Sequence, residues 1–187
     1  MDAVRRIDGY YSRSICGSSK ATITRPDNTT QYAVGDVVGT NPATNIEFTS
    51  ILPTGVNDGH FYITDAKLEV EKSAVPANMS SFTLHLFDEA PTAIADNSAW
   101  TLLLADGGKY LGSIDFNTPE DLGTTLIMWI ENINIKRKLA ANSTSLYGQL
   151  VTNGNFTPAA EDVFNIQLET VGAWYYAFYK TNKEVTF

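Results

Sequence analysis

Residues 61–72 read FYITDAKLEVEK, which is the clearest alternating pattern in the chain. From Ala66 to Lys72, apolar residues alternate with charged residues. This period of two is typical of a β-strand that has one face in the core and the other in water. Phe61 and Ile63 alternate in the opposite phase, and a one-residue shift turns every side chain to the other face. The sequence therefore predicts one long strand with a bulge or bend near residues 64 and 65.

Shorter alternating runs recur along the chain and predict further strands. Residues 81–86 alternate in the same way, and His85 falls on their polar face, where we expect it to be solvated. Residues 126–130 are apolar on both faces, which predicts a strand that is central or covered on both sides. The other expected strands lie at residues 21–24, 47–52, 110–116, 145–152, 164–169 and 174–179.

Turn residues separate these runs, and helix signals are few. Short helices are expected only at residues 90–100 and at residues 119–122, which begin with a proline. Many short strands between turns predict an all-β fold, an antiparallel β-sandwich that is jelly-roll-like and has one or two short helices. The length of 187 residues suits a single domain. We expect an N-terminal arm at residues 1–20 and one β-sandwich at residues 21–187.

The charge balance of the chain is acidic, with a formal net charge of −8 at pH 7 and a pI of about 4.6. Proteins that bind nucleic acid need a basic surface that meets the phosphates. The densest basic run here is only three residues long, from Lys136 to Lys138. We therefore expect no nucleic-acid partner.

The ends and the cysteine content bear on where the protein is made. The first residues, MDAVRRIDGYYSRSIC, lack the apolar core of a signal peptide, and no stretch has the length of a membrane-spanning helix. The single cysteine, Cys16, excludes a disulfide within the chain, and we expect it to be buried or half-buried. These features predict a protein that is made in a cytoplasm and has no membrane partner.

Asp88 and Glu89 are the most conspicuous candidates for acid–base chemistry, because a histidine, His85, lies close by in the sequence. Neighbouring carboxylates on a strand point to opposite sides, so these two cannot form a glycosidase pair with each other. We expect instead that a strand ends here at a solvated turn. The two histidines, His60 and His85, are too few for a histidine-rich metal site, and no phosphate-binding or nucleophile motif occurs. The sequence predicts a non-enzymatic protein with no catalytic residue, metal site or cofactor.

The most unusual composition is the aromatic stretch AWYYAFY at residues 173–179. On a strand, Trp174 would lie on one face, and Tyr175 and Tyr179 on the other. One interpretation is a late core strand. The other is an aromatic interface or a platform on which sugars stack, since tyrosine and tryptophan combine apolar area with a polar group.

Three separate segments resemble, in order, a family of small tailed-bacteriophage virion proteins. They are TITRPDNTTQYAVGDVVG at residues 22–39, FTLHLFDEAPTAIADNSAW at 82–100 and YLGSIDF at 110–116. The resemblance spans roughly residues 20–170 and implies a capsid decoration protein, also called an auxiliary or cement protein, or a head-fibre component. Such proteins are commonly β-sandwiches, often trimers, that bind the outer surface of the major capsid protein shell. The resemblance thus implies a virion protein at the capsid surface, made in the host cytoplasm, and it implies no site residues.

Contacts with the shell are expected from the ends of the chain. A basic arm can fold onto an acidic shell, and aromatic side chains favour interfaces. The expected interface residues are Arg5, Arg6, Arg13, Trp174, Tyr175 and Tyr179. Two alternatives stay open. One is a carbohydrate-binding module for host adhesion, with an exposed platform among Trp100, Trp129 and Trp174, and the other is a glycan hydrolase with two carboxyl groups facing each other across a cleft.

Overall fold

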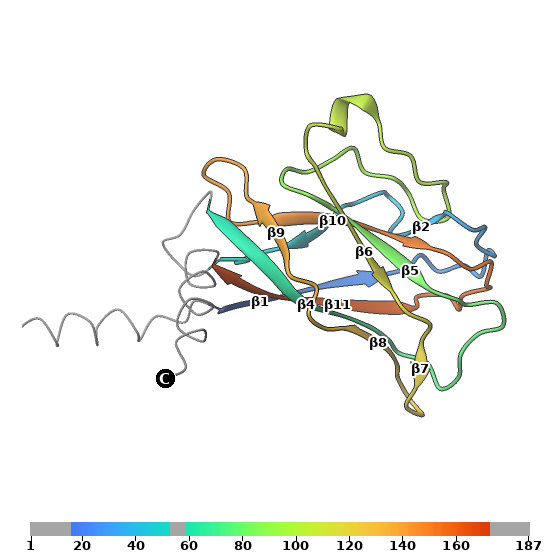
Figure 1. Ribbon diagram of the computed structural model, residues 1–187. Coiled ribbons are helices and arrows are strands. Elements are labelled where there is room, and N and C mark those ends of the chain that lie inside the picture. The colour runs from blue at the N-terminus through green and yellow to red at the C-terminus, as the bar shows by residue number, and fades with distance from the viewer. Residues whose placement is uncertain (1–15, 53–58, 173–187) are drawn as a thin grey trace, which may run out of the picture.

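The computed structural model describes residues 16–52 and 59–172, which form two antiparallel sheets packed face to face (Figure 1). The first sheet has six strands in the order β1 (Cys16–Thr24), β11 (Val163–Gly172), β4 (His60–Val70), β8 (Leu126–Ile130) and β7 (Glu120–Asp121), with β9 (Ile135–Lys138) also on β4. The second sheet has five strands in the order β2 (Val37–Val38), β10 (Leu146–Thr152), β5 (Phe82–Phe87) and β6 (Tyr110–Phe116), with β3 (Ile46–Phe48) also on β10. One 3₁₀-helix, η1, spans Leu104–Asp106.

The strand order is that of a jelly roll, as the sequence predicts. β2 and β3 both pair with the same edge of β10, and β8 and β9 both pair with the same edge of β4. Each of these two pairs of short strands therefore occupies the place of one longer strand in its sheet. The principal order is then β1-β11-β4-β8 in one sheet and β2-β10-β5-β6 in the other. Between these principal strands, the chain crosses to the opposite sheet at every connection except that from β5 to β6. These nested crossings between two antiparallel sheets define the jelly roll.

The bulge expected in the long strand is confirmed. In the pairing of β4 with β11, Asp65 lies opposite Glu169, and Ile63 lies opposite Thr170, so Thr64 is the extra residue. The extra residue restores the phase, because Phe61 and Ile63 on one side of it and the apolar residues on the other are all buried. β4 then divides its second edge between two partners, since β9 pairs with residues 60–63 and β8 with residues 66–70.

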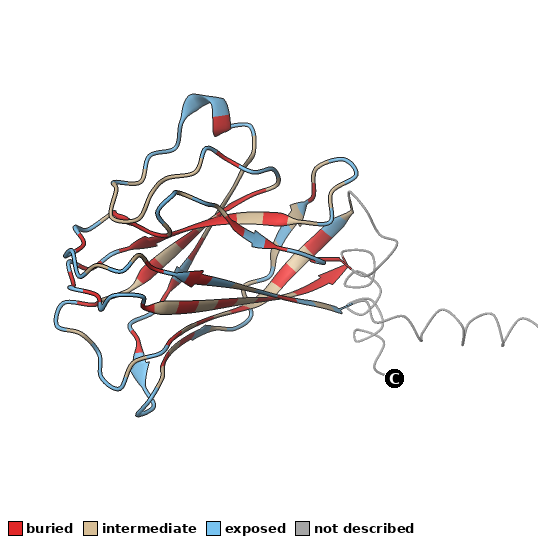
Figure 2. Ribbon diagram, turned by 180° about the vertical axis from the view of Figure 1, so that it is seen from behind, coloured by how far each residue is buried: buried red, intermediate tan, exposed pale blue. Residues whose placement is uncertain are grey.

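The core lies between the two sheets and consists of the inward-facing residues of both. Figure 2 shows the resulting alternation of buried and less buried residues along the strands. Phe82 of β5 meets Phe164 of β11 edge-on with ring centroids 5.9 Å apart, and it meets Phe156 at 6.0 Å. These contacts join the sheets directly, and such aromatic pairs contribute about 0.5–1.5 kcal/mol beyond their burial.

Several expectations are corrected by the structure. Residues 90–100 form no helix, because their backbone groups pair with β2 and the residues just before it: Asn97 N donates to Val37 O at 2.9 Å, and Trp100 N donates to Gly35 O at 2.9 Å. Residues 119–122 contain β7 rather than a helix, and the short helix that does form is η1. Residues 16–20 belong to β1, so the sandwich begins five residues before the expected boundary at residue 21.

Two expected burial states are also wrong. β8 was expected to be central or covered on both sides. It does lie between β4 and β7, but its outer face is not covered, since Trp129 keeps 54% of its surface exposed. Cys16 is exposed at the start of β1 rather than buried. The expected strand at residues 174–179 lies outside the described residues.

Candidate functional site

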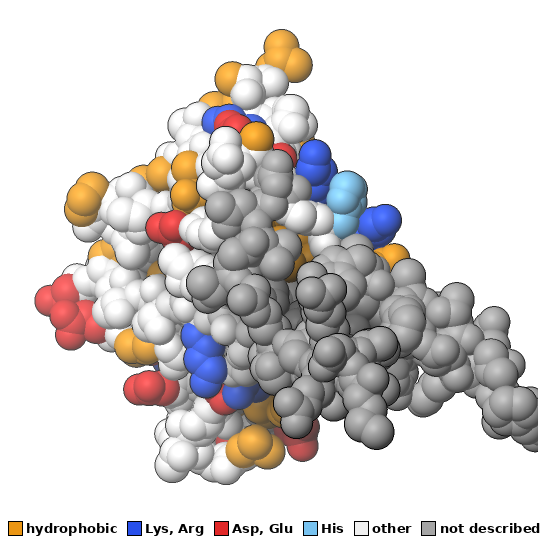
Figure 3. All heavy atoms as spheres, turned by 90° about the vertical axis from the view of Figure 1, so that its left-hand side faces the viewer, with side chains coloured by type: hydrophobic (Ala, Val, Ile, Leu, Met, Phe, Trp, Pro, Cys, Tyr) orange, Lys and Arg blue, Asp and Glu red, His pale blue; other side chains and the backbone are white. Residues whose placement is uncertain are grey.

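The longest connection within a sheet is the loop of residues 88–109, which joins β5 to β6 and projects from the sandwich at the top of Figure 1. Its outermost part holds three consecutive leucines, Leu102, Leu103 and Leu104, which are 37%, 43% and 98% exposed. We call these three residues the leucine tip. No charged residue occurs between residues 97 and 105. Figure 3 shows hydrophobic side chains projecting at this top end of the molecule.

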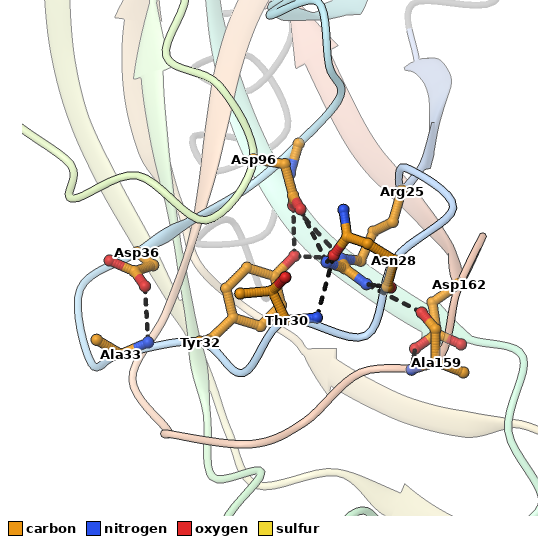
Figure 4. Close-up of polar contacts among 10 residues, drawn as sticks. Arg25, Asn28, Thr30, Tyr32, Ala33, Asp36, Asp96, Ala159 and Asp162 are labelled. Carbon is orange, nitrogen blue, oxygen red and sulfur yellow. Dashed lines mark hydrogen bonds and ion pairs between the residues drawn. The ribbon is translucent and has the colours of Figure 1, made fainter.

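The first support of the loop is a buried polar cluster around Asp96 (Figure 4). Arg25 Nη2 lies 2.8 Å from Asp96 Oδ2, and the two side chains are 0% and 2% exposed. Tyr32 Oη donates to Asp96 Oδ1 at 2.5 Å, and Gly39 N donates to the same oxygen at 3.1 Å. Arg25 Nη1 also donates to Ala159 O at 2.9 Å. The cluster thus joins the loop to the segment between β1 and β2 and to the segment before β11.

The ionisation of this cluster follows from its burial. Burial raises the pKa of Tyr32 far above its ordinary value, and the neighbouring Asp96 carboxylate raises it further. Burial alone would lower the pKa of Arg25, but its hydrogen bond to Asp96 and the charges of its partners raise that pKa overall. The cluster therefore contains a neutral phenol and a charged guanidinium at neutral pH. Removing either Arg25 or Asp96 would leave the charge of the other buried and unpaired, which destabilises a folded chain strongly.

The second support is an aromatic stack on the outer face of the five-stranded sheet. The Trp100 ring lies parallel to the His85 ring, with centroids 3.7 Å apart and an interplanar angle of 9°. Trp100 Nε1 donates to Gln149 Oε1 at 2.9 Å, and Gln149 Nε2 donates to Thr92 O at 2.9 Å. Both ends of this part of the loop are therefore fixed to β5 and β10.

The third support lies beside the leucine tip. Asp106 in η1 is buried and accepts hydrogen bonds from Thr92 N and from Lys109 Nζ, both at 2.9 Å. The hydrogen bond from Lys109 lowers the pKa of Asp106 to about 2, so this carboxylate stays charged over the physiological pH range. Lys109 Nζ also donates to Ala90 O at 3.0 Å. The two halves of the loop are thereby joined just below the leucines.

The three supports make the leucine tip a preorganised apolar surface. A loop held in advance loses little conformational entropy when it binds. Full burial of one leucine side chain contributes about 1.5–3 kcal/mol. Such a tip is suited to insertion into an apolar pocket of a partner, and it brings together no groups for acid–base or nucleophilic catalysis.

The stack of Trp100 on His85 also predicts that the stability of the chain depends on pH. Burial lowers the pKa of His85 from 6.5 to about 4, while Asp115 opposes this shift. The unfolded chain therefore binds more protons than the folded chain between these values, so stability is greatest above pH 6.5 and falls as the pH drops towards 4. Because His85 is only partly buried and solvent screens the effect, we expect a loss of about 1–2 kcal/mol.

The measurement is a series of urea denaturations between pH 7 and pH 4, on the wild type and on His85→Phe. The phenyl ring keeps an aromatic partner for Trp100 and cannot be protonated. In this variant, the free energy of unfolding should therefore fall less steeply as the pH drops from 7 to 4. Every other titratable group is the same in both proteins, so the difference between them isolates the contribution of His85. Equal slopes in the two proteins would contradict the prediction.

The residues singled out in the sequence lie apart from one another. β5 ends at Phe87, so Asp88 and Glu89 do follow a strand end, as expected; Glu89 is exposed. Burial raises the pKa of Asp88, and the charge of Glu89 raises it further. His85 was expected to be solvated, which is wrong, because Trp100 covers its ring. The expected interface residues Arg5, Arg6, Arg13, Trp174, Tyr175 and Tyr179 all lie outside the described residues.

Within residues 16–52 and 59–172, no three histidine, cysteine, aspartate or glutamate side chains converge as a metal site would require. In the same ranges, no helix is long and apolar enough to cross a membrane.

The leucine tip was not predicted from the sequence. Its signal is a run of three leucines with no charged neighbour, placed between two turn-rich stretches of an otherwise alternating chain. Exposed apolar runs of this length are uncommon unless they serve binding.

Comparison with known proteins adds solved structures alone, since no family model and no curated protein matches the chain. A chain of tomato aspermy virus is 12% identical, covers 91% of this chain and 94% of its own length, and has a TM-score of 0.31. A chain of the cyanophage Pam1 capsid is 11% identical, covers 86% of both chains, and has a TM-score of 0.36. A chain of the capsid of the Helicobacter pylori bacteriophage KHP30 is 12% identical, covers 85% of this chain and 89% of its own, and has a TM-score of 0.29. All three come from virus or phage particles, but TM-scores this low do not establish a shared fold, so the jelly roll rests on the strand order of the chain itself.

Proposed function

We propose that this chain is a bacteriophage virion structural protein, a decoration protein that binds the outer surface of the major capsid shell and stabilises it without enzymatic activity. The observation that carries the proposal is the leucine tip, an uncharged apolar surface that three sets of polar contacts hold away from a jelly-roll body. Runs of three exposed apolar residues are uncommon on soluble proteins unless they serve binding.

The family resemblance supports the proposal as well, because its segments include residues that hold the projecting loop. Of the three segments that resemble phage virion proteins, residues 22–39 hold Arg25 and Tyr32, and residues 82–100 hold His85, Asp96 and Trp100. These residues belong to the first two supports of the projecting loop, whereas Asp106 and Lys109 of the third support lie between the second and third segments. The resemblance therefore coincides with the architecture that presents the leucine tip rather than with a catalytic motif.

The proposed mechanism is burial of apolar surface at many equivalent positions. Each leucine tip inserts into an apolar pocket of the major capsid protein, and a trimer places three tips around a local three-fold axis of the shell. Linked tips then bind with avidity that exceeds the affinity of one tip. The basic arm with Arg5, Arg6 and Arg13 and the aromatic residues Trp174, Tyr175 and Tyr179 remain proposed additional contacts, on the capsid surface of a virion assembled in the host cytoplasm.

The experiment that tests the proposal uses particles of the phage that encodes the chain. Heads assembled without this protein are mixed with increasing amounts of the purified chain and sedimented, and the chain alone is sedimented as the control. We expect saturable cosedimentation at a fixed ratio to the major capsid protein, and a trimer in light scattering. Absence of the chain from purified virions, together with no binding to the heads, would refute the proposal.

A further inference from the structure

A second feature of the surface lies on the outer face of the six-stranded sheet, where Trp129 projects from β8. Leu126 and Met128 of β8 point into the core, so Ile127 and Trp129 point outward, and Trp129 is 54% exposed. This face is formed by β1, β11, β4 and β8 in that order, and the loop with the leucine tip belongs to the other sheet. The leucine tip and the supports of its loop do not use this face.

The neighbours of Trp129 are polar side chains set by the strand register. Lys67 of β4 lies opposite Trp129, and Gln167 of β11 lies opposite Lys67. One step along the strands, Glu69 lies between Ile127 and Asn165. Lys67 Nζ lies over the Trp129 ring, 5.7 Å from its centroid, and 2.9 Å from Glu69 Oε1, so a ligand must pack on the part of the ring that the ammonium leaves uncovered. An apolar ring is thus bordered by an ammonium and, beyond it, a carboxylate. The two carboxamides lie one strand away on β11, where Gln167 donates to Ser18 and Glu169, and Asn165 accepts from Thr22.

The size of the apolar area decides what kind of ligand fits. A stable protein interface buries about 1,200–2,000 Å² around an apolar core. Among the described residues of this face, Trp129 is the one large apolar side chain that is more than half exposed, and Ile127 is half-buried. A single indole ring is too small to be the core of such an interface, but it matches the area of one sugar ring.

We propose that Trp129, Lys67 and Glu69 form a binding site for a neutral hexopyranoside. The C–H face of the sugar packs on the indole ring, and adjacent hydroxyls accept from Lys67 Nζ and donate to Glu69. A neutral sugar is favoured because Lys67 and Glu69 already neutralise each other at 2.9 Å. The side chains of Gln167 and Asn165 lie one strand further out and extend the polar border for a longer glycan.

This inference does not depend on the proposed capsid role, because a chain that fails to bind heads can still bind a sugar at this face. On a virion surface, such a site would give the particle weak adhesion to host glycans. For a ligand the size of one hexose, the expected dissociation constant is on the order of 1 mM.

The test follows the tryptophan indole N–H signals in two-dimensional NMR of the ¹⁵N-labelled full chain. The probes are methyl β-D-glucopyranoside, methyl β-D-galactopyranoside and methyl α-D-mannopyranoside, and the Trp129 signal is assigned from its absence in Trp129→Phe. We expect saturable shifts of this signal with at least one probe. In the variants, which lack this indole, affinity is followed from the backbone amide signals that shift with the sugar in the wild type. It should fall about tenfold or more in Trp129→Ala, whereas Trp129→Phe should keep part of it.

The matched control is Leu122→Ala, which removes another exposed apolar side chain, 60% exposed, next to β7 of the same sheet. It should bind the sugar as the wild type does. No saturable shift up to about 100 times the expected dissociation constant, or equal affinity in Trp129→Ala, would overturn the proposal. A change of oligomeric state in Trp129→Ala, measured by light scattering, would also overturn it and would identify this face as a contact between copies.

Discussion

Replacing Arg25 with alanine is expected to lower the free energy of unfolding by about 3–5 kcal/mol. The guanidinium is fully buried, and its removal leaves the Asp96 carboxylate without its counter-ion. The carbonyl of Ala159 also loses its donor, and Tyr32 loses the group that donates to its hydroxyl. An uncompensated charge in the interior is far less stable than the intact pair.

The measurement is urea denaturation at pH 7, accompanied by a thermal scan in which the melting temperature should fall by roughly 10 °C. Arg25→Lys keeps the charge but loses the planar set of donors, so we expect an intermediate loss. Lys67→Ala is the matched control, since it removes an ion pair whose side chains are 20% and 32% exposed and should change stability by less than about 1 kcal/mol.

A loss below about 1 kcal/mol in Arg25→Ala would contradict the prediction. It would mean that water reaches the Asp96 carboxylate in the folded chain, so that the cluster does not hold the loop. A decrease of the expected 3–5 kcal/mol in the free energy of unfolding would show that the segment after β1 and the loop of residues 88–109 fold as one unit.

The strands could be predicted from the sequence because the alternation of apolar and polar residues that marks a strand lies within the strand itself. The alternation in residues 61–72 predicts both the strand β4 and its bulge, and the predicted strand at residues 110–116 matches β6 in both bounds. The helix expected at residues 90–100 is wrong for a reason that is not local. Its backbone donors Asn97 N and Trp100 N meet carbonyls in and beside β2 that lie 60 and 65 residues earlier in the chain.

The supports of the loop could not be predicted for the same reason. Arg25 and Asp96 are 71 positions apart, and Trp100 and Gln149 are 49 apart. No periodicity links residues at such separations, so nothing in the sequence pattern pairs Arg25 with Asp96 or Trp100 with Gln149. His85 shows the limit most clearly, because its place on the polar face was predicted correctly, but the ring that covers it comes from the loop.

Replacing Leu103 and Leu104 with serine together is expected to weaken binding to phage heads about 100-fold or more. Each leucine contributes about 1.5–3 kcal/mol when it is fully buried, and every 1.4 kcal/mol is a factor of ten in affinity. In the free chain, the two side chains are 43% and 98% exposed, so their replacement should change the free energy of unfolding by less than about 0.5 kcal/mol. A large loss of affinity without a loss of stability is the signature of a docking residue.

The measurement is a titration of heads that lack this protein, with bound chain quantified after sedimentation. Leu122→Ser is the matched control, because Leu122 is 60% exposed and lies beside β7, at the bottom of Figure 1 and away from the loop. It should bind the heads as the wild type does.

If the double variant binds as tightly as the wild type, the leucine tip is not the contact, and the proposed contacts of the chain ends become the ones to test. If both variants bind weakly, apolar surface at opposite ends contributes, which a single inserted tip does not explain. A selective loss in the double variant would tie the function to the loop, because the polar cluster of Asp96 and the stack on His85 then serve to present two leucines to a partner.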